Sequence, residues 1–180
     1  MKDLKMETAE IKNGSIVHAK IENIGAGTLT GRFTSTKPNA PQKVYLASGW
    51  FNEEQERRVA KAEKVLRGLG LDVFSPREHQ APELEYGSVE WRQVTFDNDI
   101  DHIDWADFLF AIYDEEDAGT MMEIGYAYAT GKPVLVYHEG HDIVNLMITD
   151  SLTAYFKDWA TVSAYDYSRM KHLPYTGSVI

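Results

Sequence analysis

The stretch KVYLASGWFNEEQERRVAKAEKVLRGLGLDVFSP, residues 43–76, contains the alternation that decides the fold. It begins with an apolar run at residues 43–47, which predicts a strand, and a turn follows at residues 48–52. Residues 53–70 predict a helix, because apolar residues recur there at helical spacing and glycines end the pattern. These apolar residues are Val59, Ala62, Val65, Leu66 and Leu69, and the glycines are Gly68 and Gly70. Residues 71–76 predict a second strand.

The same alternation continues to the end of the chain. Further strands are expected at residues 107–114 and 133–139, and a fifth at residues 161–165. Helices are expected at residues 91–106, 118–131 and 142–152. Strands that alternate with helices are typical of an α/β fold with a doubly wound parallel sheet.

Residues 1–42 differ in texture from the rest of the chain. Val17, Ala19 and Ile21 alternate with polar neighbours, and glycines punctuate the segment, which favours short strands and turns. The following KPNAPQ, residues 37–42, predicts an extended linker, because each proline disfavours helix in the residue before it. We therefore expect a β-rich extension over 1–42, a hairpin with a linker, and one domain over 43–180.

The composition excludes several classes of protein. The chain has 180 residues, 43% of them hydrophobic, and no cysteine, so we expect one cored domain without disulfides or thiolate chemistry. Neither a signal peptide nor a membrane span is readable, which predicts a soluble, cytoplasmic protein. The net charge of −10, from 18 basic and 28 acidic residues, disfavours nucleic acid and favours a small ligand.

Glu123 is the residue that fits its surroundings least. It is the only charged residue between Ala118 and Gly131, in an apolar helix that follows the third strand. Because a helix N-terminus favours a carboxylate, we expect Glu123 to be ionised and partly desolvated. It is either a nucleophile or general base, or a structural residue that is paired with an unseen Arg or Lys or exposed.

Other candidates follow from where ligands bind in such sheets, beyond the carboxyl ends of the strands. Tyr45 lies close to this edge, and Gly49, Trp50 and Phe51 follow the first strand, where the aromatic rings suit either stacking on a planar ligand or the core. Asp117 is expected to cap the helix after the third strand, and the alternative is a bond to ligand hydroxyls.

The helix at residues 91–106 offers a further carboxylate. Asp99 lies at the edge of the apolar stripe of Phe96, Ile100 and Ile103, whereas Asp97, Asp101 and Asp104 project to the opposite, solvated side. No EF-hand pattern and no zinc spacing of histidines is present, so a metal is disfavoured. Neither G-x-G-x-x-G nor a Walker lysine pattern follows the first strand, so dinucleotide and P-loop chemistry lose support.

Several motifs together closely resemble the nucleoside 2-deoxyribosyltransferases. They are VYLASGWFNEEQ, FDNDI, DEEDAGTMMEIGYA, GKPVLV, VNLM and the terminal YTGSVI, in this order across residues 43–180. The resemblance implies a flavodoxin-like fold and an enzyme of deoxynucleoside salvage that exchanges the base of a 2′-deoxynucleoside for another free base, without cofactor or metal. It also implies a homo-oligomer whose active sites are shared between subunits.

The resemblance assigns a role to each candidate. Glu123 matches the nucleophile that attacks C1′, Tyr45 the tyrosine that positions it, and Asp99 the acid that manages the proton of the base. Asp117 matches a residue that holds the sugar hydroxyls. Asn145 and Met147 match residues that reach the active site of a neighbouring subunit. Water must be excluded between the two half-reactions, and Met121, Met122, Trp50 and Phe51 are candidates for that dry wall.

Two rival interpretations stay open. One is an N-glycoside hydrolase on the same fold, such as a deoxynucleoside-monophosphate glycosidase, although the acidic DEEDAG at residues 114–119 would repel a 5′-phosphate. The other is a nucleotide-sensing module without turnover, which would need no nucleophile. The sequence leaves open the purine or pyrimidine preference, the size of the oligomer, the tolerance for a 2′-hydroxyl, and the roles of residues 1–42 and of Ile180.

Overall fold

The computed structural model describes residues 5–12, 15–23, 27–31, 41–113, 117–140 and 143–180, with side chains from residue 41 onward. The chain divides into two compact units, Met1–Ala40 and Pro41–Ile180.

The first unit contains a three-stranded antiparallel sheet in the order β1-β2-β3. Its strands are β1 (Lys5–Lys12), β2 (Ser15–Asn23) and β3 (Gly27–Gly31). The alternating residues Val17, Ala19 and Ile21 lie on β2, within the segment for which strands were expected. This sheet has one strand more than the predicted hairpin.

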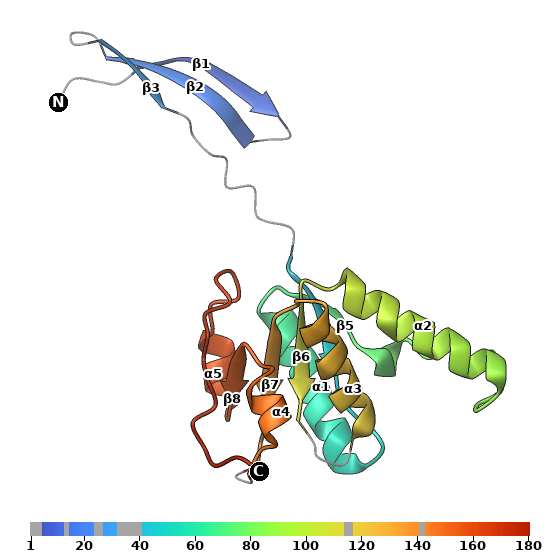
Figure 1. Ribbon diagram of the computed structural model, residues 1–180. Helices are drawn as coiled ribbons and strands as arrows, with labels where there is room; N and C mark the ends of the chain where they lie inside the picture. The colour runs from blue at the N-terminus through green and yellow to red at the C-terminus, as the bar shows by residue number, and fades with distance from the viewer. Residues whose placement is uncertain (1–4, 13–14, 24–26, 32–40, 114–116, 141–142) are drawn as a thin grey trace. The chain divides into compact units, whose positions relative to one another are not determined.

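The second unit is built on a five-stranded parallel sheet in the order β5-β4-β6-β7-β8 (Figure 1). The strands are β4 (Lys43–Ala47), β5 (Asp72–Phe74), β6 (Phe108–Ile112), β7 (Val134–Tyr137) and β8 (Ala154–Phe156). The chain adds β5 on one side of β4 and the later strands on the other, which is the flavodoxin-like order. The predicted fold class is therefore confirmed, and the switch point of the topology lies between β4 and β6.

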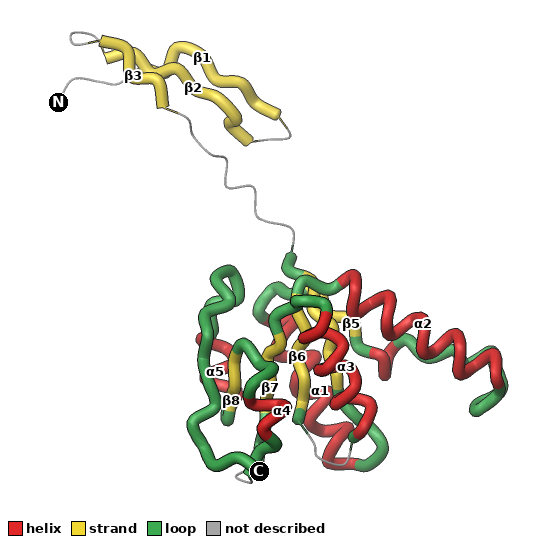
Figure 2. Tube along the Cα trace, viewed as in Figure 1, coloured by secondary structure: helices red, strands yellow, loops and turns green. Residues whose placement is uncertain are grey.

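Helices cover both faces of this sheet (Figure 2). They are α1 (Glu53–Gly68), the short 3-10 helix η1 (Pro76–Glu78), α2 (Val89–Trp105), α3 (Ala118–Ala129), α4 (Leu146–Thr149) and α5 (Trp159–Ala164). Alternate strand residues point to opposite faces, so Tyr45 and Leu109 join the core beneath α3 and α4. Val44 and Phe110 join the core beneath α1 and α5.

Two predicted elements are placed wrongly. The fifth strand is β8, whereas residues 161–165 mostly belong to α5, whose N-cap Asp158 accepts a hydrogen bond from the Thr161 amide at 2.7 Å. The helix expected at residues 142–152 is only α4, because Val144 forms a parallel β-bridge with Val179 and Asn145 caps the helix after it.

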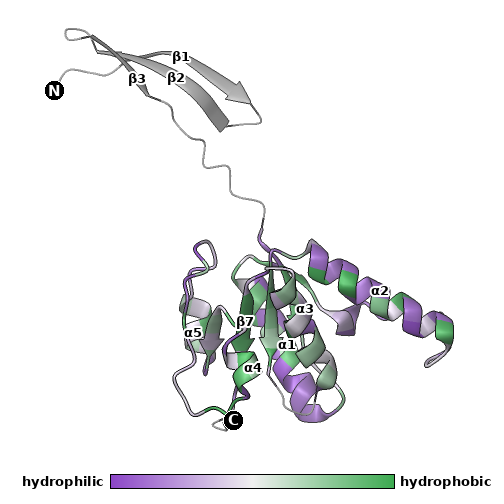
Figure 3. Ribbon diagram, in the orientation of Figure 1, coloured by the Kyte–Doolittle hydropathy of each residue, from purple (hydrophilic) through white to green (hydrophobic). Residues whose placement is uncertain are grey.

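Helix α2 is held less firmly than the other long helices. Of its 17 residues only Ile103 is buried, and Phe96 of the predicted apolar stripe is 56% exposed. Figure 3 shows polar and apolar residues mixed along α2 as it extends away from the sheet. Among the described residues no helix is long and apolar enough to cross a membrane.

Candidate active site

The candidate residues gather at the carboxyl edge of β4 and β6, beside the topological switch point. Tyr45 lies in β4, Gly49 follows that strand, and Asp117 precedes α3, the helix that carries Glu123. Parallel strands end at one edge of a sheet, so these side chains from distant parts of the sequence meet there. Residues 114–116 of the acidic DEEDAG stretch lie outside the described residues.

A short hydrogen bond joins the two central residues. The Tyr45 hydroxyl donates to Glu123 Oε1 at 2.6 Å. Tyr45 is fully buried, and this burial, followed by the charge of Glu123, raises the pKa of its phenol, so the hydroxyl keeps its proton and remains a donor. Within the described part of the chain Glu123 makes no salt bridge, which argues against the structural alternative of an Arg or Lys partner.

The protonation state of Glu123 differs from the expectation. The pKa of Glu123 is raised to about 8, chiefly by burial. The hydrogen bond from Tyr45 opposes this shift, and the charges of Asp99 and Asp117 add to it. Glu123 is the sixth residue of α3, beyond the first turn in which a helix terminus stabilises an anion. The shift of this pKa favours the protonated form of Glu123 in the free chain, in contrast to the ionised carboxylate expected from the sequence.

Asp99 faces the same site from α2. Burial raises the pKa of this half-buried carboxyl to about 6, and its charge acts in turn on Tyr45 and Glu123. Asp99 also lines a cavity of about 580 Å³ with Trp91 and Phe96. The predicted position at the edge of the helix stripe agrees with this placement. Within that stripe Ile103 is buried, Ile100 is half-buried and Phe96 is exposed.

The opposite face of α2 is solvated, as expected, because Asp97, Asp101 and Asp104 are all exposed. Asp104, expected there with Asp97 and Asp101, accepts a hydrogen bond from the Tyr126 hydroxyl of α3 at 3.1 Å. The contact links α2 to α3 near the end of α2 at which Ile103 is buried.

Asp117 caps α3, as expected. Its Oδ1 accepts from the Gly119 amide at 3.0 Å, and its Oδ2 accepts from the Thr120 hydroxyl at 2.6 Å. Both oxygens are thus held in fixed directions, and each retains a lone pair for a second donor.

Gly49 lies close enough to Asp117 that a larger residue would crowd the site. A Cβ at position 49 would stand 3.1 Å from Asp117 Oδ2 and 3.1 Å from Gln55 Nε2. Gln55 is buried, and its Oε1 accepts from the Phe51 amide at 2.8 Å, so it fixes the loop after β4. Gln55 was missed in the sequence, although its place three residues after the N-cap Asn52 matches a capping box.

The two aromatic residues after β4 have different surroundings. Trp50 is half-buried and packs against the core beneath α1 and α5, whereas Phe51 is 75% exposed. Their rings stack with centroids 5.7 Å apart. Of the methionines expected in the dry wall, Met121 packs on the core and Met122 is 45% exposed, so the wall is open in a single chain.

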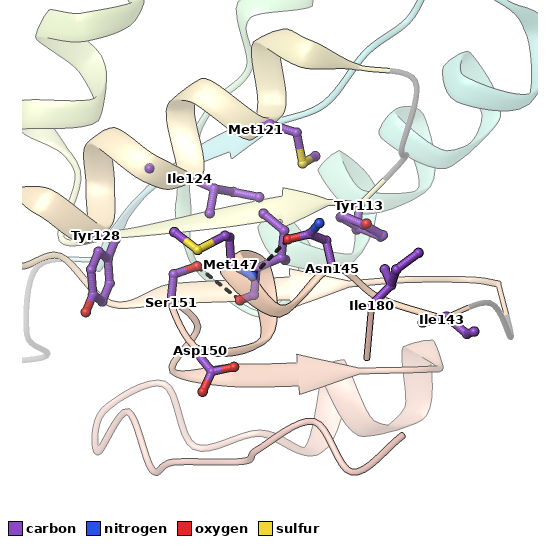
Figure 4. A pocket seen from close by; sticks show the side chains of 12 residues that line it. Tyr113, Met121, Ile124, Tyr128, Ile143, Asn145, Met147, Asp150, Ser151 and Ile180 are labelled. Carbon is purple, nitrogen blue, oxygen red and sulfur yellow. Dashed lines mark hydrogen bonds between the residues drawn. The ribbon is translucent and has the colours of Figure 1, made fainter. Parts of the chain in front are cut away.

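Asn145 and Met147 lie at a second location, a cavity of about 990 Å³ between α3 and the segment around α4 (Figure 4). Asn145 caps α4 by accepting from the Met147 amide at 2.9 Å, and the Met147 side chain is 71% exposed. Glu123, Tyr45 and Asp99 are not among the described residues that line this cavity. One chain therefore does not bring Asn145 and Met147 to Glu123.

An aromatic stack behind Tyr45 was also missed in the sequence. The Tyr45 ring stacks on Phe74, with centroids 5.7 Å apart, and Phe74 stacks on His102 of α2 at 3.6 Å. No local pattern signals these contacts, since the three residues belong to three elements. Among the described residues no group of three or more His, Asp or Glu side chains is arranged to hold a metal ion.

Comparison with known proteins gives a consistent result. Residues 44–154 match the family model for nucleoside 2-deoxyribosyltransferase. A nucleoside deoxyribosyltransferase of Limosilactobacillus fermentum is 28% identical over 161 residues, which are 78% of this chain and 95% of that protein. One of Lactobacillus leichmannii is 32% identical over 125 residues, which are 59% of this chain and 79% of that protein.

A solved structure is also similar. It is that of a 2-deoxyribosyltransferase from the psychrotolerant bacterium Bacillus psychrosaccharolyticus, with 54% sequence identity and a TM-score of 0.73. The match covers 74% of this chain and 99% of that one.

Proposed function

The chain belongs to the nucleoside 2-deoxyribosyltransferase family, pentosyltransferases that act on deoxynucleosides, and on that premise we propose that Glu123 carries the deoxyribosyl group covalently between two bases. The observation that supports this most is the 2.6 Å hydrogen bond from Tyr45 to Glu123 Oε1. It fixes one carboxyl oxygen and leaves the other to face C1′ of the sugar.

In the first half-reaction Glu123 attacks C1′. The C1′–O bond to the carboxylate forms as the C1′–N bond to the base breaks, and the leaving base takes a proton from Asp99. The reaction thus needs an ionised Glu123 and a protonated Asp99, the reverse of the order of their pKa values in the free chain. Positive charge that develops on the sugar stabilises the Glu123 anion, and the nitrogen of the base accepts from Asp99, so bound substrate favours this arrangement.

In the second half-reaction the incoming base replaces Glu123. Its nitrogen attacks C1′, the ester bond to Glu123 breaks, and Asp99 takes the proton that the base loses. Two displacements at one carbon give overall retention and ping-pong kinetics. Between the two half-reactions water must not reach the ester that joins Glu123 to the sugar. We assign the exclusion of water to the side chains of Phe51, Trp50 and Met121.

The remaining candidates bind the substrate. Asp117 accepts hydrogen bonds from the sugar hydroxyls with the lone pairs that its capping bonds leave unused. Gly49 leaves room beside Asp117, and the exposed ring of Phe51 offers a stacking face to the base.

The side chains expected to exclude water from the site are partly exposed in a single chain, which supports a homo-oligomer with shared sites. Met147 is 71% exposed and Leu146 47% exposed, beside the cavity that Asn145 lines. Apolar side chains in such a group usually mark a contact with another protein. In this proposal Asn145 and Met147 complete the site of a neighbouring subunit. A cytoplasmic location remains a prediction from the composition.

The test is a chromatographic assay of purified protein with thymidine and adenine. We expect thymine and deoxyadenosine to appear in equal amounts, and Glu123→Ala to abolish both. A control without adenine should release thymine far more slowly. If thymine forms equally fast without adenine and no deoxyadenosine appears, the protein is a hydrolase. If Glu123→Ala retains the exchange, the covalent role of Glu123 is wrong.

A further inference from the structure

The position of Asp99 depends on a helix that is weakly anchored. Asp99 lies in the middle of α2, and the one buried residue of that helix, Ile103, comes four residues later. From Val89 to Phe96 most side chains are exposed, so this half of the helix has little packing to hold it. A proton donor must lie within hydrogen-bond reach of its acceptor, and a shift of about 1 Å can cost as much as 100-fold in rate.

His102 supplies an anchor near Asp99. Its ring lies flat against Phe74, with centroids 3.6 Å apart and an interplanar angle of 12°. Its Nδ1 lies 2.7 Å from the carbonyl oxygen of Asn98, the residue before Asp99. Because a carbonyl can only accept, Nδ1 carries the proton in this contact, and the ring direction is fixed to the turn that holds Asp99.

Phe74 connects this anchor to the other half of the site. Its ring also stacks on that of Tyr45, with centroids 5.7 Å apart and an interplanar angle of 23°. Tyr45 holds Glu123 through its hydroxyl. One phenylalanine ring is therefore in contact both with the residue that fixes Glu123 and with the residue that fixes the turn of Asp99.

We infer that His102 and Phe74 are positioning residues that set the distance between Asp99 and Glu123. They touch neither substrate nor reacting atoms, and they act by holding α2 against β5 and β4. The inference rests on the proposed function, in which Asp99 protonates the leaving base. It predicts that loss of the His102 ring impairs proton transfer to the base and not the attack by Glu123.

The chain offers a matched control. His79 also stacks on Phe74, with centroids 4.4 Å apart, but it follows η1 and its Nδ1 contacts the carbonyl of Ser75. His79→Ala therefore removes an imidazole from the same phenylalanine but leaves the stack of Phe74 on His102. Of the contacts of α2 it removes only the more distant one between the His79 and His102 rings, whose centroids lie 6.4 Å apart. His102→Phe keeps an aromatic ring on Phe74 and serves as the conservative replacement.

The experiment compares two donors that differ in their need for an acid. 2′-Deoxyuridine needs protonation of its base, whereas the base of 5-trifluoromethyl-2′-deoxyuridine holds negative charge better and leaves more easily without it. For each variant kcat/KM is measured with both donors and one acceptor base. Asp99→Asn removes the acid and serves as the reference. The ratio of its kcat/KM values for the two donors is the ratio expected when the leaving base is no longer protonated.

We expect His102→Ala to lower kcat/KM for deoxyuridine roughly 10- to 100-fold, and to lower it markedly less for the trifluoromethyl donor. In His102→Ala the ratio of the kcat/KM values for the two donors should move toward the ratio found for Asp99→Asn. His102→Phe should restore the ratio of the parent chain, and His79→Ala should leave that ratio unchanged. Equal losses with both donors, or the same change of ratio in His79→Ala, would overturn the inference.

A second measurement is independent of turnover. Amide hydrogen exchange of α2 should be faster in His102→Ala than in His79→Ala, with the largest difference in residues 89–99. If the parent chain exchanges no bases, the proposed function fails and this measurement still tests the anchor. Identical exchange of α2 in the two variants would show that His102 does not hold the helix.

Discussion

The Tyr45 hydroxyl and Glu123 Oε1 lie 2.6 Å apart although 78 positions separate the two residues in the sequence. Tyr45→Phe removes the donor and keeps the ring that stacks on Phe74. A hydrogen bond to a charged group contributes about 1.5–3 kcal/mol, so kcat/KM should fall roughly 10- to 100-fold. The hydrogen bond lowers the pKa of Glu123, and its loss should therefore raise that pKa and move the alkaline limb of the pH profile upward.

The matched control is Tyr137→Phe. Tyr137 is another buried tyrosine in a strand of the sheet. Its hydroxyl donates to Glu139 Oε1 at 3.3 Å, so it makes its hydrogen bond outside the proposed site. Tyr137→Phe should leave both the rate and the pH profile nearly unchanged. An unchanged rate in Tyr45→Phe would instead mean that Glu123 is held without the tyrosine.

The pH dependence of kcat/KM should be bell-shaped, with limbs near pH 6 and pH 8. The pKa of Asp99 is raised to about 6 and that of Glu123 to about 8, and the active form carries a single proton on the pair. Below the first value both groups are protonated and no nucleophile exists. Above the second value both are ionised and no acid remains.

The Asp99→Asn variant checks the sign of this argument. Without the charge of Asp99 the pKa of Glu123 should fall below 8, because that charge raises it. With no acid to lose, the alkaline limb should vanish, and the low remaining rate should rise with pH to a plateau. A bell that persists in this variant would assign the proton donor to another group.

The protonation state of Glu123 that favours folding is the opposite of the one that catalysis needs. Attack on C1′ requires the ionised carboxylate, whereas burial favours the protonated carboxyl. The folded pKa of about 8 lies above the ordinary value of 4.5, so the folded chain binds the proton more tightly than the unfolded chain. The contribution of Glu123 to stability is then fully present below pH 4.5 and is lost as the pH rises through about 8. Glu123→Gln removes this penalty and can still accept from Tyr45.

We therefore expect Glu123→Gln to melt at a higher temperature than the parent chain at pH 8.5, by about 2–4 °C for each 1 kcal/mol of relief. At pH 5 the two chains should melt at similar temperatures. Calorimetry at both pH values makes the comparison, and a variant that is less stable at pH 8.5 would contradict the burial argument.

The fold could be predicted from the sequence where apolar runs and helical periodicity alternate, from residue 43 to residue 139. The fifth strand was placed wrongly because β8 has only three residues, too few to show alternation. Its identity depends on pairing with β7 and on a bridge from Ala154 to Leu173. The short α4 has a similar cause, since the bridge of Val144 to Val179 joins distant segments that no local pattern connects.

The site could be predicted only in part. A lone Glu123 in an apolar helix was a local signal, and so was an aspartate placed to cap that helix. The protonation of Glu123 was not predictable, because it depends first on burial in the folded chain and then on the charge of Asp99, which lies on a different helix. The stack of Phe74 on His102 was hidden for the same reason, since β5 and α2 meet only in the folded chain.

Gly49→Ala should lower activity while the chain stays folded. The new methyl group would stand 3.1 Å from Asp117 Oδ2 and 3.1 Å from Gln55 Nε2, so Asp117 or the loop must shift. We expect a rise in KM of about 10-fold, as for a contact worth about 1.4 kcal/mol. Gly68→Ala is the control, because a Cβ there meets nothing within 4 Å. Equal values of kcat and KM in the two variants would show that Gly49 does not contribute to substrate binding.

Mixing two inactive variants tests whether sites are shared. Glu123→Ala lacks the nucleophile, and the double variant Asn145→Ala with Met147→Ala lacks the residues proposed to reach the neighbour. In hybrid oligomers some sites combine an intact Glu123 with an intact Asn145 and Met147, so about one quarter of the activity should return for random pairing. Mixtures that stay inactive after subunit exchange would show that each chain builds its own site.

The half-buried Glu123 also affects how this protein can be improved by directed evolution, because the residue needed for catalysis lowers the stability of the fold. In a library of random mutants that is screened for heat resistance alone, replacements of Glu123 by uncharged residues would be enriched. The surviving clones would be well folded and chemically inert. A campaign toward a more robust catalyst must therefore assay turnover in every round, and it should seek its added stability in parts of the chain far from this carboxyl group.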